Sequence, residues 1–130
     1  MMIDENRISQ IIVSSAVEVH STLGGPGLLE SVYEEALVWE LLQRGLLVER
    51  QKMIPINYKG NLLATPLRID LLVNNLVIVE CKAVAQYNPI FEAQALTYLR
   101  ITGLKLALVI NFGSKLAKHG IKRVVNGLYK

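Results

Sequence analysis

Apolar residues near the start of the chain recur at spacings of three and four, the period of a helix with one buried face. The stripe consists of Ile8, Ile11, Ile12, Ala16, Val19 and Leu23. It predicts a helix over residues 6–22, ended by the breaker Gly24-Gly25-Pro26-Gly27. A second helix is predicted over residues 28–44, with Gly45 just past its end. Its inner face is expected to hold Leu29, Val32, Tyr33, Ala36, Leu37 and Leu41.

After this helix the pattern becomes extended. Three segments, 47–58, 62–73 and 76–83, are rich in apolar residues and are separated by Lys59-Gly60-Asn61 and Asn74-Asn75. This arrangement predicts a three-stranded antiparallel meander.

The last third of the chain predicts one more helix and two more strands. A helix opened by a proline is expected over residues 89–102 and stops at Gly103. The continuous apolar run 106–112 is typical of a fully buried strand, and residues 121–128 predict an edge strand. The order α-α-β-β-β-α-β-β predicts an α/β fold, with helices packed on a mixed sheet in a single domain of residues 1–130.

Composition narrows the class of protein. The chain has 130 residues, of which 52% are hydrophobic and 19% charged, as in a globular domain. Charged residues interrupt the most apolar region, so no membrane span is expected. The N-terminal residues show no basic segment leading into an apolar stretch, as a secretory signal would. The single cysteine, Cys81, excludes an internal disulfide and a cysteine-based zinc cluster, and a cytoplasmic location is expected.

The formal net charge of +3 leaves room for a polyanionic partner without requiring one. Several basic residues gather in the last part of the sequence: Lys115, Lys118, Lys122, Arg123 and Lys130. A solvated rim is favoured slightly over a patch that contacts phosphate groups.

Asp70 and the triplet Glu80-Cys81-Lys82 lie inside two hydrophobic runs that are predicted to be neighbouring strands. A carboxylate is costly to bury there unless something compensates its charge. Glu80 and Lys82 share one face because side chains alternate along a strand, whereas Cys81 points into the opposite face.

The loop between these two strands decides whether the carboxylates meet. A three-residue loop, residues 74–76, pairs Val73 with Val77 and sets the two carboxylates side by side. A two-residue loop places them on opposite faces and abolishes the site. The metal-site hypothesis therefore predicts the three-residue loop, with Asn75 in the left-handed conformation.

Two close carboxylates repel each other unless a cation or a proton intervenes. Oxygen ligands of this kind suit Mg²⁺, with Mn²⁺ as an alternative ion. Lys82 would then stabilise an attacking hydroxide or the charge that develops on phosphorus. The alternative is a buried salt bridge between Lys82 and either Asp70 or Glu80, which is the commoner arrangement for an acidic pair taken alone.

Two further pairs of residues add to the acidic cluster. Glu30 and Tyr33 are three apart in the second helix, and Gln94 and Tyr98 are four apart in the third. The inner face of the third helix is expected to hold Ile90, Gln94, Thr97, Tyr98 and Ile101. Each pair also has an ordinary structural explanation: Glu30 as an acid at a helix N-terminus and Gln94 as a hydrogen-bonded core amide.

With these residues, nearly the whole chain resembles the small proteins named for their GxxExxY motif, within the PD-(D/E)XK nuclease superfamily. The GxxExxY residues are Gly27, Glu30 and Tyr33. The superfamily pattern is matched by Asp70, by Glu80-Cys81-Lys82 for ExK, and by Gln94 and Tyr98 for Q-x-x-x-Y. A lone D…ExK is a weak signal, whereas the ordered set is a specific one.

The resemblance implies a restriction-endonuclease-like αβββαβ core preceded by an N-terminal helix. It implies Mg²⁺ held by Asp70 and Glu80, with a further metal or water contact from Glu30. The implied function is metal-dependent hydrolysis of phosphodiester bonds in DNA or RNA.

The same resemblance implies catalytic roles for three more residues. Lys82 would assist the nucleophile, and Gln94, with Tyr98 of the same motif, would orient it or touch the scissile phosphate. Members of the family often carry a His near the position of Phe91, and this chain lacks it.

Two other functions are compatible with the sequence. The chain could be a non-catalytic module that binds nucleic acid or a protein partner and retains the nuclease fold. It could also act as a homodimer, since a mean hydropathy of +0.34 is high for so small a chain. His20 can be a general base or a helix-terminal residue, and Glu40 can pair with a buried cation or mark a subunit contact.

Overall fold

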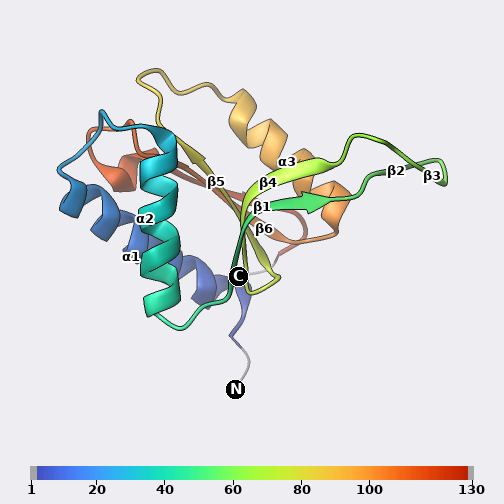
Figure 1. Cartoon of the computed structure of the whole chain (residues 1–130), viewed down its shortest axis with the longest axis horizontal. Coiled ribbons are helices and arrows are strands. Elements are labelled where there is room, and N and C mark those ends of the chain that lie inside the picture. Colours follow the sequence, from blue (N-terminus) through green and yellow to red (C-terminus); the bar gives the residue numbers. More distant parts are fainter. Residues whose placement is uncertain (1–2, 129–130) are drawn as a thin grey trace.

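Two helices precede a sheet in the computed structural model of the chain, which describes residues 3–128 (Figure 1). The helices are α1 (Glu5–Leu23), α2 (Glu30–Gln43) and α3 (Ile90–Thr102), with a 3-10 turn η1 (Ala117–Gly120). The strands are β1 (Val48–Ile54), β2 (Asn57–Tyr58), β3 (Asn61–Leu62), β4 (Leu67–Val73), β5 (Val77–Lys82), β6 (Leu106–Asn111) and β7 (Ile121–Val125). Lys130 of the predicted basic group lies outside the described residues.

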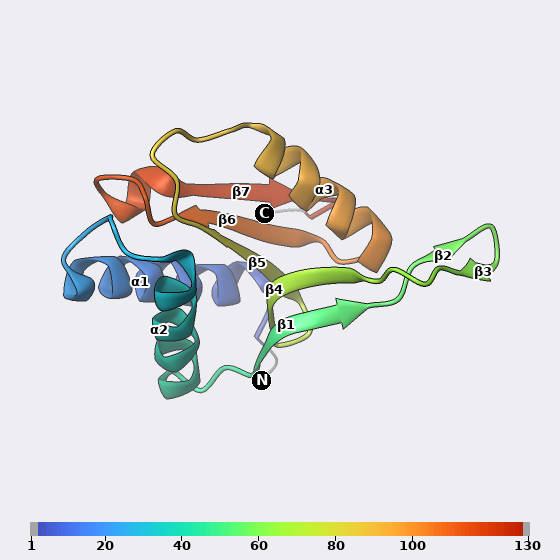
Figure 2. The same ribbon diagram turned by 45° about the horizontal axis from the view of Figure 1, so that its top comes forward.

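Five strands form one mixed sheet in the order β1-β4-β5-β6-β7. Only β5 and β6 run parallel, joined by α3, and the other neighbours are antiparallel. Helix α3 covers one face of the sheet, and α1 and α2 pack on the other (Figure 2). The predicted mixed α/β fold is confirmed, and it is consistent with a restriction-endonuclease-like core. None of the helices described has the length and apolar character that crossing a bilayer requires.

The predicted meander is confirmed in β1, β4 and β5, but its first two strands are shorter than expected. β1 ends at Ile54 and β4 begins at Leu67, and the segment between them forms a separate two-stranded ribbon of β2 and β3. Pro55 and Pro66 flank this ribbon. Because proline has no backbone N–H to donate to a ladder, the main sheet ends at these positions.

The β4–β5 loop has the predicted length. Val73 pairs with Val77, so the loop consists of residues 74–76. Asn75 adopts the left-handed conformation with φ 56°, as predicted, and Asn74 does so too with φ 50°. The Asn74 side chain also accepts a hydrogen bond from the Leu47 backbone at 2.7 Å, which fixes the loop against the start of β1.

The buried faces of α2 and α3 differ from the prediction. In α2 the side chains of Tyr33, Leu37 and Leu41 are buried, but Leu29 and Val32 are exposed. Leu29 occupies the N-cap position, just before the first helical residue, and its side chain makes no capping hydrogen bond. In α3 the buried residues are Ala95 and Leu99. The predicted inner-face residues Ile90, Gln94, Thr97 and Ile101 are exposed.

Strands β1 and β4 change the core they face halfway along their length. In β4, Leu67 and Ile69 pack in the core under α3, whereas Leu71 and Val73 pack in the core under α1 and α2. Regular alternation would keep all four on one face. The change occurs at Asp70, and the strand turns there.

Candidate functional site

An open cavity of about 370 Å³ lies between α2, the β4–β5 pair and α3. Its lining is formed by Glu30, Ser31, Glu34, Gln51, Arg68, Asp70, Glu80, Lys82, Gln94 and Tyr98. The six residues predicted for the site from the sequence are all in this set. The fold therefore brings together side chains that are up to 68 positions apart, from Glu30 to Tyr98.

Asp70 and Glu80 hold the two strands together at the point where the backbone ladder stops. The last paired residues are Leu71 and Val79, so Asp70 lies opposite Glu80. There the Glu80 carboxylate accepts a hydrogen bond from the Asp70 backbone N–H at 2.8 Å. The Asp70 carboxylate accepts one from the Cys81 N–H, also at 2.8 Å. These two side-chain hydrogen bonds take the place of backbone pairing at this point, and they fix the position of both carboxylates.

One oxygen of each carboxylate remains available. The hydrogen bonds use Oε2 of Glu80 and Oδ2 of Asp70. Within residues 3–128, no buried side-chain oxygen or nitrogen lacks a hydrogen-bond partner. The other two oxygens, Oε1 of Glu80 and Oδ1 of Asp70, make no hydrogen bond within these residues, so they are accessible from the cavity. Two fixed carboxylates with open oxygens can bind a cation.

Negative charge accumulates in this cavity. Burial, reinforced by the charge of Asp70, raises the pKa of Glu80 to about 8. Burial also raises the pKa of Glu30, with a further contribution from Asp70. Lys82 acts on both groups in the opposite direction. Its single charge does not offset the burial and repulsion of the acids, so the cavity favours a proton or an additional cation.

Lys82 shares the cavity face with Glu80, as predicted, but forms no salt bridge with either acid. Among residues 3–128 the ion pairs are Arg44–Glu40, Arg50–Glu34 and Lys52–Glu49. The buried salt-bridge alternative is therefore wrong. The Lys82 ammonium instead lies 4.7 Å from the centre of the Phe91 ring, which α3 contributes. An aromatic face can hold a cation without neutralising it.

The residues of the GxxExxY motif have separate tasks at the N-terminus of α2. Gly27 has φ 114°, a conformation that favours glycine, and lets the chain turn into the helix. The Tyr33 hydroxyl donates to the Gly25 carbonyl at 2.7 Å, and its ring stacks on Phe112 at 4.8 Å. This contact anchors the turn to the core. Glu30, the first residue of α2, is thereby held at the rim of the cavity.

Gln94 and Tyr98 reach the cavity from α3. Gln94 is exposed and lines the cavity, so the alternative of a buried core amide is wrong. Tyr98 is half-buried, and burial raises its pKa, with smaller contributions from the charges of Glu80 and Asp70. Both side chains are hydrogen-bonding groups next to the acidic pair.

The sequence reasoning missed four lining residues, among them Glu34, Gln51 and Arg68. Glu34 lies one helical turn after Glu30, and Arg68 lies two residues before Asp70, so both share a face with a predicted site residue. Their spacing could have identified them.

Gln51 gave no such signal. It lies opposite Asp70 in β1, because Arg50 pairs with Leu71 and Lys52 with Ile69. Its φ of 53° is left-handed. Its amide donates to Glu34 at 2.8 Å, and this buried carboxylate also accepts from Arg50 at 3.1 Å. The contact ties β1 to α2 beside the cavity.

Other residues considered from the sequence lie elsewhere. His20 is buried, with Nε2 2.9 Å from the Ser114 carbonyl oxygen, and does not line the cavity; its general-base alternative is wrong. Glu40 pairs with Arg44 at 3.6 Å. Cys81 lies in the core, where burial raises the pKa of its thiol well above the ordinary value.

The donor set resembles a magnesium site more than a closed metal cage. Within residues 3–128, no three His, Cys, Asp or Glu side chains are arranged to enclose an ion. Mg²⁺ commonly takes one or two carboxylates and keeps several waters, which bridge to substrate oxygens. Asp70 and Glu80 fit that requirement, with Glu30 at the rim of the same cavity.

Comparison with known families agrees with this site. Residues 6–124 match the sequence profile of the PD-(D/E)XK nuclease superfamily, so the chain belongs to that superfamily. Its nucleases generally use divalent metal ions. Searches among curated proteins and among solved structures found no significant match. The resemblance is thereby confirmed for the superfamily, and membership of the GxxExxY family stays a prediction.

Proposed function

We propose that this chain is a nuclease that hydrolyses phosphodiester bonds in DNA or RNA with Mg²⁺, or alternatively Mn²⁺, bound at Asp70 and Glu80. The observation that carries this proposal is the crossed pair of hydrogen bonds between the two carboxylates and the opposite strands. It fixes both groups while leaving an oxygen of each accessible. Such a pre-organised, repelling pair is useful for binding a metal ion and costly without one.

The remaining residues divide the work around the scissile phosphate. The ion supplies Lewis-acid polarisation of a phosphoryl oxygen and a more acidic water. Lys82 donates hydrogen bonds to the attacking oxygen or to the charge developing on phosphorus, since its ammonium is not consumed by an ion pair. Gln94 and Tyr98 orient the attacking water or a phosphate oxygen from α3. Glu30 would contact the bound ion or one of its waters from the same cavity.

Several finer features complete the proposal. The GxxExxY motif supports membership of the family of that name, and in this proposal residues 1–130 act as one nuclease-like domain in the cytoplasm. A homodimer is compatible with the exposed apolar side chains of α2, among them Trp39 at 60% and Leu42 at 51% exposure. Two copies would present two sites to two strands.

The test combines metal binding with cleavage. Calorimetric titration of Mg²⁺ and Mn²⁺ is compared between the wild type and Asp70→Asn, followed by assays on single- and double-stranded DNA and RNA. Asp70→Asn should lose both metal binding and cleavage, and Lys82→Met should retain metal binding while cleavage falls by about a thousandfold. Glu35→Gln, an exposed acid of α2 outside the cavity, should change neither.

Other outcomes would replace this function. Nucleic-acid binding without cleavage, unaltered by Asp70→Asn, would identify the chain as a non-catalytic module that retains the nuclease fold. Absence of metal binding by the wild type, even with nucleic acid present, would refute the proposed metal site.

A further inference from the structure

The β2–β3 ribbon projects from the ends of β1 and β4, beyond the five-stranded sheet (Figures 1 and 2). Asn57 pairs with Leu62, and Tyr58 with Asn61. Both residues of the turn between them, Lys59 and Gly60, have positive φ, 50° and 82°. This is the turn geometry that matches the natural twist of a two-residue hairpin. The ribbon is therefore a locally well-formed element with no part in either core.

The ribbon lies in an acid-free part of the chain. Residues 50–69 hold four basic side chains, Arg50, Lys52, Lys59 and Arg68, and no acidic one. Arg50 and Lys52 form ion pairs, whereas Lys59 and Arg68 are in none of those found in residues 3–128. Arg68 lines the cavity beside Asp70. Arg68 at the cavity and Lys59 at the tip of the ribbon are thus the basic side chains outside those ion pairs in this segment.

The tip presents side chains of the kinds that contact nucleic acids. Tyr58 is 58% exposed, and the Lys59 ammonium lies 5.4 Å from its ring centre. Leu62 is 69% exposed, and Asn57 is exposed next to it. Lysine and tyrosine bind phosphates, asparagine pairs with base edges, and apolar groups contact the thymine methyl.

We propose that this ribbon enters the major groove of duplex DNA next to the scissile phosphate, so that the substrate is double-stranded DNA; the proposal rests on the nuclease function above. The major groove of B-DNA, about 12 Å wide, admits a two-stranded β-ribbon. The major groove of A-form RNA is too narrow for side chains to read. Single strands offer no groove, and their usual platforms are rows of aromatic residues, which this ribbon lacks.

The length of the connection sets where the contact falls. Asp70 lies ten positions after Gly60 of the turn, so the tip lies within roughly 35 Å of Asp70 even if the chain between them is fully extended. One turn of B-DNA is about 34 Å long. The ribbon therefore contacts the duplex on one side of the cut, within about one helical turn.

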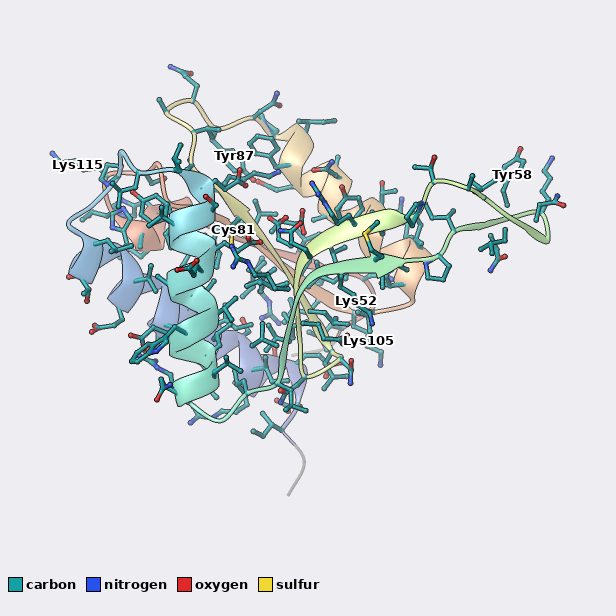
Figure 3. The ribbon with its side chains drawn as sticks, in the orientation of Figure 1. Lys52, Tyr58, Cys81, Tyr87, Lys105 and Lys115 are labelled. Carbon is teal, nitrogen blue, oxygen red and sulfur yellow. The ribbon has the colours of Figure 1, made fainter. Side chains whose placement is uncertain are left out.

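The experiment measures binding separately from cleavage. Asp70→Asn protein is titrated with a labelled DNA duplex of about two helical turns, its single strands and the matching RNA duplex, at several salt concentrations. Tyr58→Ala/Lys59→Ala should weaken duplex DNA binding about tenfold or more, and Lys59→Ala alone should reduce the salt slope by about one. Lys115→Ala removes an exposed lysine at the opposite end of the molecule (Figure 3) and should change neither quantity.

A second measurement tests the placement. Because the only cysteine of the chain is buried, Leu62→Cys can carry a photo-crosslinker at a single reactive site. The crosslinks should fall on one side of the cut, and trimming the duplex on that side alone should weaken binding. Equal thermal midpoints for the wild type and the ribbon variants show that the exposed substitutions leave the fold intact.

The outcomes separate this proposal from the nuclease function. Cleavage by the wild type with unchanged binding in the ribbon variants would overturn the ribbon proposal alone. Ribbon-dependent duplex binding by a wild type that never cleaves would support the ribbon and overturn the nuclease function. Equal or tighter binding of single strands or RNA, or a ribbon variant that changes only the oligomeric state, would overturn the ribbon proposal.

Discussion

The two halves of the sheet differ in how regular they are. In β5 and β6, six consecutive residue pairs are in parallel register from Val77↔Leu106 to Lys82↔Asn111, and side chains of β5 alternate between the two cores and the cavity. In β1 and β4 the alternation shifts at Gln51 and Asp70, where the β1–β4 ladder is interrupted and next to which the β4–β5 ladder ends.

The difference shows that the two halves contribute to the site in different ways. The regular half supplies Glu80 and Lys82 on β5, which is paired with β6 along its whole length. In the irregular half, backbone pairing between β1 and β4 is interrupted at Gln51 and Asp70, and both side chains line the cavity. Backbone strain is tolerated at functional sites when the surrounding structure enforces it.

The largest expected effect comes from adding a side chain at Gly113, which follows β6 in the regular half. A Cβ on Gly113 would lie 2.2 Å from the Val84 carbonyl oxygen, and both segments are held by the Asn111 amide. Gly113→Ala should therefore lower the free energy of unfolding by about 3 kcal/mol or more in urea denaturation. Gly45→Ala meets no neighbour and has only its φ of 83° to oppose it, so about 1 kcal/mol is expected. Equal losses would show that the regular half is not rigid at this point.

The acidic pair, where the two halves meet, should make metal-free stability depend on pH. Glu80 has its pKa raised from 4.5 to about 8, so between these values the folded protein binds the proton more tightly than the unfolded chain. This contribution is fully present below pH 4.5 and is lost as the pH rises through about 8. In EDTA, the thermal midpoint of Glu80→Gln should gain about 5 °C or more on that of the wild type between pH 5 and 9.

Two controls accompany this comparison. Glu35→Gln should run parallel to the wild type at all pH values, and Mg²⁺ should restore wild-type stability at high pH. A constant difference between Glu80→Gln and the wild type across the range would contradict the raised pKa.

The backbone strain at Gln51 can be measured with two pairs of variants in β1, one pair at Gln51 and the other at Met53. Gln51→Gly and Gln51→Ala both lose the amide contact with Glu34, but only alanine places a Cβ on a left-handed residue. Gln51→Gly should therefore be the more stable by about 1 kcal/mol. At Met53, an exposed position of the same strand, the order should reverse by about 0.5–1 kcal/mol. The same order at both positions would show that no strain is stored at Gln51.

The sequence predicted the regular half of the molecule well, because there local rules decide the outcome. The apolar segments, the Asn74-Asn75 loop and the buried run 106–112 predicted which parts of the chain form strands, and the metal-site hypothesis selected the three-residue loop that joins Asp70 to Glu80. Burial and backbone pairing act together in such strands, so pattern and structure agree.

The irregular features could not be predicted in this way. The left-handed Gln51 donates a hydrogen bond to Glu34 of α2, a tertiary contact to which its own sequence neighbourhood gives no clue. Gln94 is exposed while Ala95 and Leu99 are buried, and the apolar spacing in this short helix did not specify which face turns toward the sheet. The end of β1 at Ile54 could have been predicted from Pro55, which interrupts a segment that otherwise has the pattern of a single strand.

The smallest effect concerns the contact between Phe91 of α3 and Lys82 of β5. Phe91 holds the Lys82 ammonium over its ring at 4.7 Å, where it can point into the cavity without pairing with an acid. Phe91→Leu should lower the free energy of unfolding by only about 0.5–1 kcal/mol and reduce the cleavage rate a few-fold, with unchanged Mg²⁺ affinity. Phe91→Tyr keeps the aromatic face and should retain the wild-type rate. Restoration of the rate by tyrosine but not by leucine would identify a cation–π contact that positions Lys82, whereas equal rates in both variants would show that Phe91 only fills space beneath α3.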